Sequence, residues 1–224
     1  MSGRSGKNIW RRRTAMVCAI DVCGATNVKE QNLNTAGLMH SGALFLDRDG
    51  VVNVDRGYIR RPDQCEFVPG IFELARFWTN ELRRPIVVVT NQSGIGRGYF
   101  DENAYADLTR WMCDRFEAEH TAIARVYHCP YHPLDGIGEY RRDHPRRKPK
   151  PGMLLQAASD LGLGPAHCAI LGDKMSDMEA GAATGRFYRT AITICRARLK
   201  NAAARLGPRS SSAIASSSHG SNRA

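Results

Sequence analysis

The 224-residue sequence lacks any run of about 20 uninterrupted apolar residues, which argues against a membrane-spanning helix. It also lacks an internal repeat, and its 42% hydrophobic and 24% charged residues are typical of a globular protein rather than a collagen-like, coiled-coil or disordered chain. Its seven cysteines include no C-x-x-C pair, and an odd count argues against a disulfide-stapled secreted fold. We therefore expect one domain of ordinary size in the cytoplasm, with no membrane partner.

Acidic residues are missing from one end of the chain. The net charge is +10, yet residues 186–224 carry eight Lys and Arg and no acid, while residues 1–40 have a balance of +4. Residues 41–185 are therefore nearly neutral, at −2. A nucleic-acid-binding module presents its basic side chains on one folded face, so this distribution predicts basic ends and no nucleic-acid partner.

Composition divides the chain into three parts. Residues 1–40 lack sustained periodicity and are interpreted as a poorly ordered basic extension, residues 41–200 as the folded domain, and residues 201–224 as a low-complexity tail. The segment 10–20 faintly resembles an export signal, but Asp21 ends its apolar run after about seven residues. An export signal and a translation start at Met39 remain alternatives for this extension.

Short apolar runs alternate with helical periodicity across the folded domain. Pro and Gly mark the boundaries, and the run at 86–89 is β-branched, as is typical of a strand covered on both faces. The predicted strands are 43–46, 86–89, 123–127 and 169–171, with 191–195 as a candidate last strand, and the predicted helices are 71–84, 101–119, 151–161 and 177–183. This order predicts an α/β fold, a Rossmann-like parallel sheet with helices on both faces. No insertion is long enough for a large cap domain, so we expect an open site roofed by short loops.

Polar side chains stand directly after the predicted strands. Asp47 and Asp49 follow the first strand, Thr90 the second and Asp173 the fourth, while Lys148 precedes the helix that leads to the fourth. Right-handed crossovers bring the carboxyl ends of parallel strands to one edge, where open α/β sheets bind ligands. Each residue alone could be a turn, a helix cap or a solvated loop residue. Together they predict magnesium-assisted phosphoryl transfer, because Mg²⁺ binds few carboxylates and a carboxylate can attack phosphorus.

Four segments carry a family resemblance. LFLDRDGVVN, VVVTNQSGIGRG, RKPKPGM and ILGDKMSDM resemble the four motifs of the haloacid dehalogenase (HAD) superfamily of phosphatases. Through NVDRGYI, TNQSGIGRGYF and the CPYHP…RRKPKPGM loop, the chain is most similar to the D,D-heptose 1,7-bisphosphate phosphatase family. The resemblance covers residues 43–185. Histidinol-phosphate phosphatases share the motif order and are the main alternative.

The resemblance implies a role for each matching residue. Asp47 would be the nucleophile, and Asp49 the acid that protonates the leaving oxygen and then activates water. The side chains of Asp47 and Asp173, with the backbone carbonyl of Asp49, would hold Mg²⁺. Thr90 and Lys148 would stabilise the transferring phosphoryl group, and Asp177 would orient Lys148 or the metal ligands. The residues implied in substrate binding are Asp55, Arg56, Gly57, Tyr58, Asn91, Gln92, Ser93, Arg147 and Lys174.

The loop before Arg147 departs from the family pattern. Many members hold this loop with zinc through a C-x-H pair and a later C-x-C pair. Here Cys129 is kept, but Tyr131, His144 and Arg146 stand at the other three positions. Structural zinc requires four good ligands, so we expect no zinc and a loop held by proline packing and ion pairs. An altered zinc site of Cys129, His132 and His144, completed by His128 or Asp143, is the alternative.

The function implied is a magnesium-dependent phosphatase. It would hydrolyse a sugar phosphate, D-glycero-D-manno-heptose 1,7-bisphosphate, through an aspartyl-phosphate, supplying nucleotide-activated heptose for lipopolysaccharide or capsule. We expect a monomer. The alternatives are a histidinol-phosphate or other sugar-phosphate phosphatase, and a catalytically silent binding protein, which has no need to keep the four charged residues Asp47, Asp49, Lys148 and Asp173.

Overall fold

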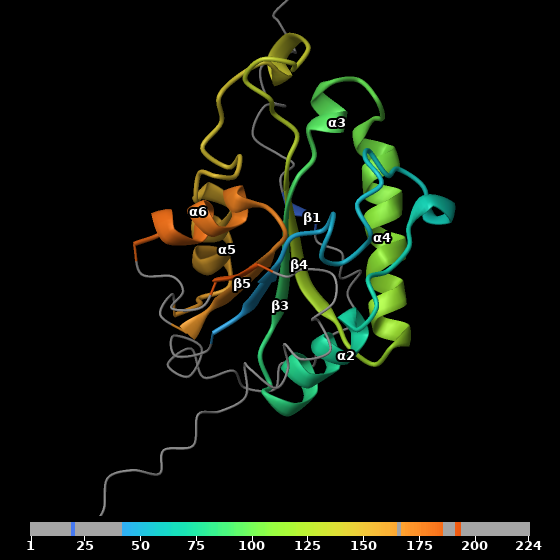
Figure 1. Ribbon diagram of the computed structural model, residues 1–224, viewed down its shortest axis with the longest axis vertical. Helices are drawn as coiled ribbons and strands as arrows, with labels where there is room; N and C mark the ends of the chain where they lie inside the picture. The colour runs from blue at the N-terminus through green and yellow to red at the C-terminus, as the bar shows by residue number, and fades with distance from the viewer. Residues whose placement is uncertain (1–18, 21–41, 165–166, 186–190, 194–224) are drawn as a thin grey trace, which may run out of the picture.

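The computed structural model describes residues 19–20, 42–164, 167–185 and 191–193 (Figure 1). The predicted extension and tail lie almost entirely outside these residues. The described strands are β1 (Ala19–Ile20), β2 (Leu44–Leu46), β3 (Ile86–Asn91), β4 (Ile123–Cys129), β5 (Ala169–Gly172) and β6 (Ala191–Thr193). The described helices are α2 (Ile71–Arg76), α3 (Ser93–Gly96), α4 (Glu102–Ala118), α5 (Gly152–Asp160) and α6 (Met175–Ala183), with short turns η1 (Pro62–Gln64), η2 (Phe77–Glu81) and η3 (Gly138–Tyr140). None of the helices in these ranges is long and apolar enough to cross a membrane.

The strands form one sheet in the order β1-β4-β3-β2-β5-β6. Strands β2 to β6 run parallel. In the central strand β2, Leu44 pairs with Ile86 of β3 on one side and with Ala169 of β5 on the other. Strand β1 lies antiparallel to β4 at one edge of the sheet. The central strands read as continuous apolar runs because both of their faces are covered. The predicted α/β fold is confirmed.

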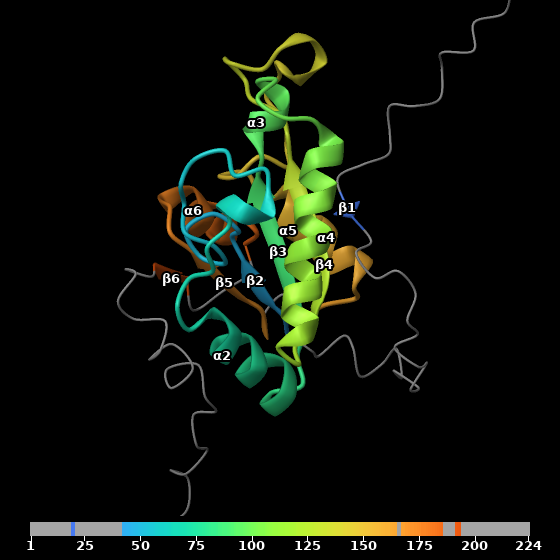
Figure 2. The same ribbon diagram turned by 90° about the vertical axis from the view of Figure 1, so that its right-hand side faces the viewer.

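Helices cover both faces of the sheet (Figures 1 and 2). Along each strand alternate side chains point to opposite faces, so Leu44, Leu46, Ile86 and Val88 pack against α2 and α4. Their neighbours in the strands belong to the second core, which packs against α5 and α6 and includes Phe45, Val87, Val89, Ile170, Met153, Leu154 and Ala180. These two cores fix the strand ends in space, and the site depends on those ends.

Several boundaries differ from the predicted ones. The predicted helix 71–84 is divided into the α-helix α2 and the π-helical turn η2, which ends at Glu81. The helical segment does not extend past Pro85, because proline cannot donate a backbone hydrogen bond. Strands β3 and β4 each extend two residues beyond their apolar runs, because Thr90, Asn91, His128 and Cys129 continue the pairing. The short helix α3 and the strand β1 were not predicted, since neither carries a periodic apolar pattern long enough to detect.

The two longest connections at the carboxyl ends of the strands contain little regular structure. Between β2 and α2 the only regular element is η1, and the loop between β4 and α5 contains only η3. That loop and α3 rise beyond the sheet edge, at the top of Figure 1. The described chain therefore leaves the sheet edge without a cap domain, as predicted.

Candidate active site

Asp47 is buried at the end of β2. Its backbone N–H donates to the Leu171 carbonyl at 2.9 Å, which aligns it with β5, and the residue is only 5% exposed. Its Oδ1 accepts from the Arg48 backbone N–H at 2.7 Å and lies 2.9 Å from Lys148 Nζ. Burial raises the pKa of Asp47 to about 6, and the nearby Lys148 cation opposes that rise. Asp47 is therefore a poorly hydrated carboxylate near neutral pH, which suits a nucleophile.

Lys148 is held by three groups at once. Its Nζ lies 2.9 Å from Asp47 Oδ1 and 2.6 Å from Asp177 Oδ1, and it donates to the Val89 carbonyl at 2.8 Å. Burial disfavours the ammonium charge, but the two carboxylates outweigh burial and raise the pKa of Lys148. Its backbone is fixed as well, because the Asn91 side chain both donates to the Lys148 carbonyl and accepts from its N–H. Lys148 is thus a permanently charged, fixed donor beside the nucleophile.

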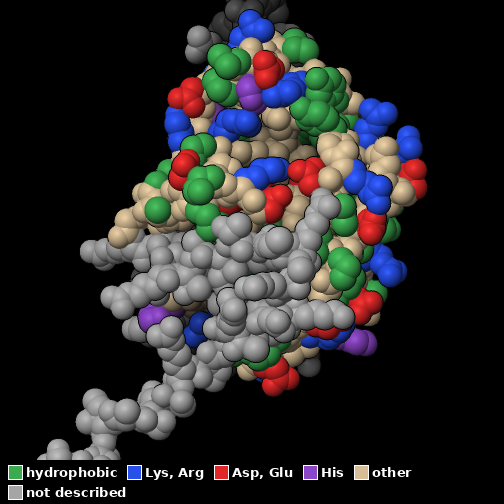
Figure 3. Space-filling model, in the orientation of Figure 1, with side chains coloured by type: hydrophobic (Ala, Val, Ile, Leu, Met, Phe, Trp, Pro, Cys, Tyr) green, Lys and Arg blue, Asp and Glu red, His purple; other side chains and the backbone are tan. Residues whose placement is uncertain are grey.

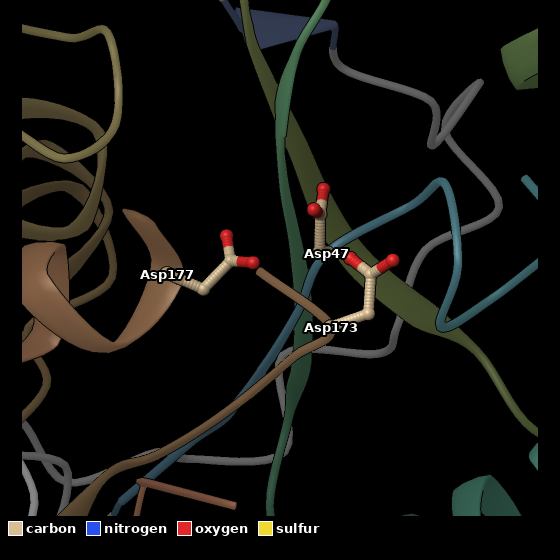
Figure 4. Close-up of side chains that lie close together, drawn as sticks. All are labelled: Asp47, Asp173 and Asp177. Carbon is tan, nitrogen blue, oxygen red and sulfur yellow. The ribbon is translucent and has the colours of Figure 1, made fainter. Parts of the chain in front are cut away.

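Three carboxylates lie close together at the ends of the strands (Figure 4). Asp47 from β2, Asp173 after β5 and Asp177 from α6 each offer an oxygen within 4.8 Å of the others, and this is the one such group of three metal-ligand side chains in the described residues. Asp177 is already engaged, because its Oδ2 accepts from the Lys174 N–H at 3.1 Å and its Oδ1 pairs with Lys148. Asp177 therefore fits an orienting role.

Asp173 is the member of this group with free ligand capacity. Its Oδ1 is buried and makes no hydrogen bond to the described part of the chain, and burial raises the pKa of this carboxyl. Gly50 lies against it with φ +94°, and a Cβ there would come within 2.1 Å of Asp173 Oδ2. Hard carboxylate oxygens with one unpartnered buried atom fit a magnesium ion, and only glycine leaves this space open.

Asp49, two residues after Asp47, is held as an anion. Arg48 forms a bidentate pair with it through Nε and Nη2, at 2.9–3.1 Å, and Asn53 and Gln92 each donate a further hydrogen bond. Burial alone would raise the pKa of Asp49, but Arg48 and these amides lower it. Sequence analysis did not identify Arg48 and Asn53. The available signal for Arg48 was its place between two aspartates, and in the structure it is only 2% exposed.

Seven of the nine predicted substrate-binding residues line one cavity of about 290 Å³. Thr90 is fully buried at the end of β3, where its Oγ1 accepts from Gln92 Nε2 at 2.9 Å. Lys174 Nζ donates to Asp55 Oδ2 at 3.1 Å, and both residues line the cavity. The space-filling view shows a hollow on this face with acidic and basic side chains around it (Figure 3). The cavity is lined by Asp49, Asp55, Gly57, Tyr58, Asn91, Gln92, Ser93, Gly94 and Lys174.

Two predicted substrate-binding residues do not line this cavity. Arg56 forms an ion pair with Glu66 and borders a neighbouring cavity of about 440 Å³. Arg147 lies in the loop after β4, and its Nη1 donates to the Tyr131 carbonyl at 3.0 Å. Arg97, which sequence analysis did not identify, donates to the Tyr58 hydroxyl at 2.8 Å. A glycine-rich turn with one arginine was the available signal for it.

The three candidate zinc ligands are not brought together as a metal group among the described residues. Cys129 is buried at the end of β4. His132 Nδ1 accepts from the Asp135 N–H at 3.0 Å, and His144 Nδ1 accepts from the Arg146 N–H at 3.2 Å. Burial, together with neighbouring arginines, lowers the pKa of both imidazoles, which agrees with their acceptor role.

The chain is similar to several known proteins. The model of the HAD-hydrolase-like family matches residues 145–191. A D-glycero-alpha-D-manno-heptose-1,7-bisphosphate 7-phosphatase of Burkholderia mallei is 45% identical over 157 residues, 70% of this chain and 82% of that protein. A D-glycero-beta-D-manno-heptose-1,7-bisphosphate 7-phosphatase of Haemophilus influenzae is 43% identical over 142 residues, 62% of this chain and 74% of that protein.

Solved structures of HAD-type phosphatases are also similar to this chain. A HAD-like phosphatase from Mesorhizobium loti is 41% identical with a TM-score of 0.62, over 65% of this chain and 69% of that one. A D,D-heptose 1,7-bisphosphate phosphatase from B. bronchiseptica, complexed with magnesium and phosphate, is 26% identical with a TM-score of 0.61, over 74% of this chain and 97% of that one. Magnesium and phosphate thus occur together in a protein with this fold, and the acidic group here is compatible with magnesium.

Proposed function

Because the chain belongs to the HAD phosphatases, in the family of the heptose-1,7-bisphosphate 7-phosphatases, we propose that it removes the 7-phosphate from D-glycero-D-manno-heptose 1,7-bisphosphate. The observation that carries the chemistry is the placement of Lys148 Nζ, 2.9 Å from Asp47 and 2.6 Å from Asp177. A fixed cation beside a buried carboxylate suits phosphoryl transfer to that carboxylate, because the cation can stabilise the negative charge on the transferring phosphoryl oxygens.

The first step transfers the phosphoryl group to Asp47. A carboxylate oxygen of Asp47 attacks phosphorus, the bond between phosphorus and the sugar oxygen breaks, and Asp49 supplies the proton for that oxygen. Asp49 is an anion in the absence of substrate, since Arg48 lowers its pKa. The incoming phosphate dianion raises that pKa again, because a nearby like charge disfavours ionisation, and so allows Asp49 to hold the proton.

The second step frees the enzyme. Asp49, now ionised, takes a proton from water, the resulting hydroxide attacks the phosphorus, and the bond to Asp47 breaks to release inorganic phosphate. The ionised state that Arg48, Asn53 and Gln92 stabilise is the state this step requires. One carboxyl group thus serves as acid and then as base.

Asp47, Asp173 and the backbone carbonyl of Asp49 would hold magnesium. When bound, the ion offsets the repulsion between the Asp47 carboxylate and the incoming phosphate. The buried, unpartnered Asp173 Oδ1 and the space kept open by Gly50 support this assignment. Asp177 stays outside the set and keeps Lys148 in position.

A phosphorylated sugar fits the cavity beside the nucleophile. Its wall offers the Asp55 carboxylate and the Asn91, Gln92 and Ser93 side chains to sugar hydroxyls, and the Lys174 cation to an anionic group. The product would supply nucleotide-activated heptose for surface polysaccharide. We propose that the enzyme acts as a monomer in the cytoplasm.

A substrate panel on the purified enzyme tests the proposal. Phosphate release is measured from both anomers of D-glycero-D-manno-heptose 1,7-bisphosphate, from the heptose 7-phosphate and from histidinol phosphate, with Asp47→Asn as the blank. We expect the highest kcat/KM for one anomer of the bisphosphate. A higher kcat/KM for histidinol phosphate would overturn the substrate assignment while leaving the phosphatase chemistry intact, and no release from any ester would overturn both.

A further inference from the structure

An aromatic and cationic cluster occupies the loop between β4 and α5. The Tyr131 ring stacks on the His144 ring, with centroids 4.3 Å apart and planes 18° from parallel. The Arg142 guanidinium lies over the Tyr131 ring, its Cζ 4.1 Å from the centroid, and the Tyr140 ring is 5.7 Å away. We call Tyr131, Tyr140, Arg142 and His144 the Tyr131 cluster. Stacked rings and a guanidinium over an aromatic face are both stabilising arrangements.

The cluster stands where the family resemblance implies zinc, and the residues present do not fit that metal. His144 is committed to Tyr131 by its ring and to the Arg146 N–H by Nδ1. His132 accepts backbone N–H groups of its own turn, from Leu134 and Asp135. A structural zinc site needs four converging ligands, and in the described chain these side chains do not converge.

Two members of the cluster hold Arg147 directly. The Tyr131 carbonyl accepts from Arg147 Nη1 at 3.0 Å, and the His144 carbonyl accepts from the Arg147 backbone N–H at 3.0 Å. We propose that the stacked pair of Tyr131 and His144 positions the Arg147 guanidinium for the substrate, so that this loop is organised without a metal. Stacking of the two side chains brings together the two carbonyls that fix both ends of the arginine.

Lys148, the next residue, is fixed by a different part of the fold. Asn91 binds its backbone on both sides, and Asp47, Asp177 and the Val89 carbonyl bind its Nζ. Loss of the Tyr131 cluster should therefore displace Arg147 and leave Lys148 in place. The family resemblance implies that Arg147 binds the substrate and that Lys148 binds the transferring phosphoryl group, so the inference predicts a change in KM with kcat preserved. This step rests on the proposed function.

The test is a double-mutant cycle between Tyr131→Ala and Arg147→Ala, read as kcat and KM on the preferred ester of the substrate panel. We expect Tyr131→Ala to raise KM by about tenfold, as a small misplacement of a binding group does, with kcat within about twofold. Tyr131→Phe, which keeps the ring, should behave as wild type. The double variant should have the KM of Arg147→Ala alone, because the tyrosine acts through the arginine.

A matched control is Leu134→Ala, which truncates a side chain 74% exposed in the same loop and should leave both constants unchanged. If Tyr131→Ala lowers the melting temperature strongly, His144→Leu enters the same cycle, since it removes the other ring of the stack. Additive effects of the two substitutions, or a fall in kcat alone, would overturn the positioning role. So would near-stoichiometric zinc in protein grown with zinc, lost on Cys129→Ser. A wild type inactive on every ester would instead refute the proposed function.

Discussion

Asn91 and Lys148 exchange two hydrogen bonds although 57 residues separate them in the sequence. The Asn91 Nδ2 donates to the Lys148 carbonyl at 2.9 Å, and its Oδ1 accepts from the Lys148 N–H at 3.0 Å. The side-chain amide thereby replaces a strand partner and attaches the catalytic loop to the end of β3. Placement of the Lys148 ammonium beside Asp47 depends on this attachment, in addition to its own ion pairs.

Replacement of this amide should lower the rate of phosphoryl transfer. Asn91→Ala removes both hydrogen bonds and leaves a backbone N–H and a carbonyl without their partner, which costs about 1–3 kcal/mol. We expect kcat/KM to fall by about tenfold to a hundredfold. Asn80→Ala is the control, because the Asn80 side chain makes only exposed hydrogen bonds far from the site: it donates to the His120 carbonyl and accepts from the Thr79 hydroxyl. Equal effects of the two substitutions would show that Asn91 does not position Lys148.

The nucleophile can be tested by one isosteric change. Asp47→Asn keeps the shape of the side chain but removes the charge that attacks phosphorus, so turnover should fall by about a thousandfold or more. The melting temperature should not fall, since a buried carboxylate with a raised pKa is itself costly. Activity within tenfold of wild type would remove Asp47 from the nucleophile role.

Arg48 should set the pH at which Asp49 works. The pKa of Asp49 is lowered chiefly by the Arg48 cation, against the effect of burial. Arg48→Gln removes that cation, the pKa of Asp49 rises, and the ionised form needed to activate water appears only at higher pH. We therefore expect the acidic limb of the pH profile of kcat to move to higher pH.

The matched control for Arg48 is Arg76→Gln, which removes an arginine paired with Glu119 on a distant helix. This variant should keep the wild-type pH profile. An unshifted acidic limb in Arg48→Gln, with the protein folded as judged by circular dichroism, would show that Asp49 does not limit the reaction at low pH.

Metal removal should abolish activity and lower stability together. EDTA should inactivate the enzyme and added Mg²⁺ should restore it, with a rise in melting temperature because the ion binds the native state alone. Asp173→Asn removes a ligand whose Oδ1 has no other partner in the described structure, so the magnesium-dependent rise should be lost. Gly50→Ala should have the same effect, because its Cβ would displace the Asp173 carboxylate. A magnesium response that survives both substitutions would place the metal elsewhere.

The sequence by itself determined the sheet and the arrangement of its strand ends. The β-branched run at Ile86–Val89 and the helical spacing of Ile71, Leu74 and Trp78 specify buried elements, because period and burial follow directly from side-chain direction. Once the strands are parallel, Asp47, Thr90 and Asp173 must share one edge. The predicted fold and the convergence of these residues therefore needed no coordinates.

Tertiary structure alone decided how the charges at that edge are paired. Arg48 turns inward to Asp49, Asp177 is occupied by Lys148, and Tyr131 stacks on His144. The physical reason is that the last two contacts join segments far apart in the sequence, so they leave no local signal. The direction in which Arg48 turns depends on the side chains that pack around it. Loop conformation depends on which distant partner satisfies each buried polar group, and that becomes defined only when the whole domain has packed.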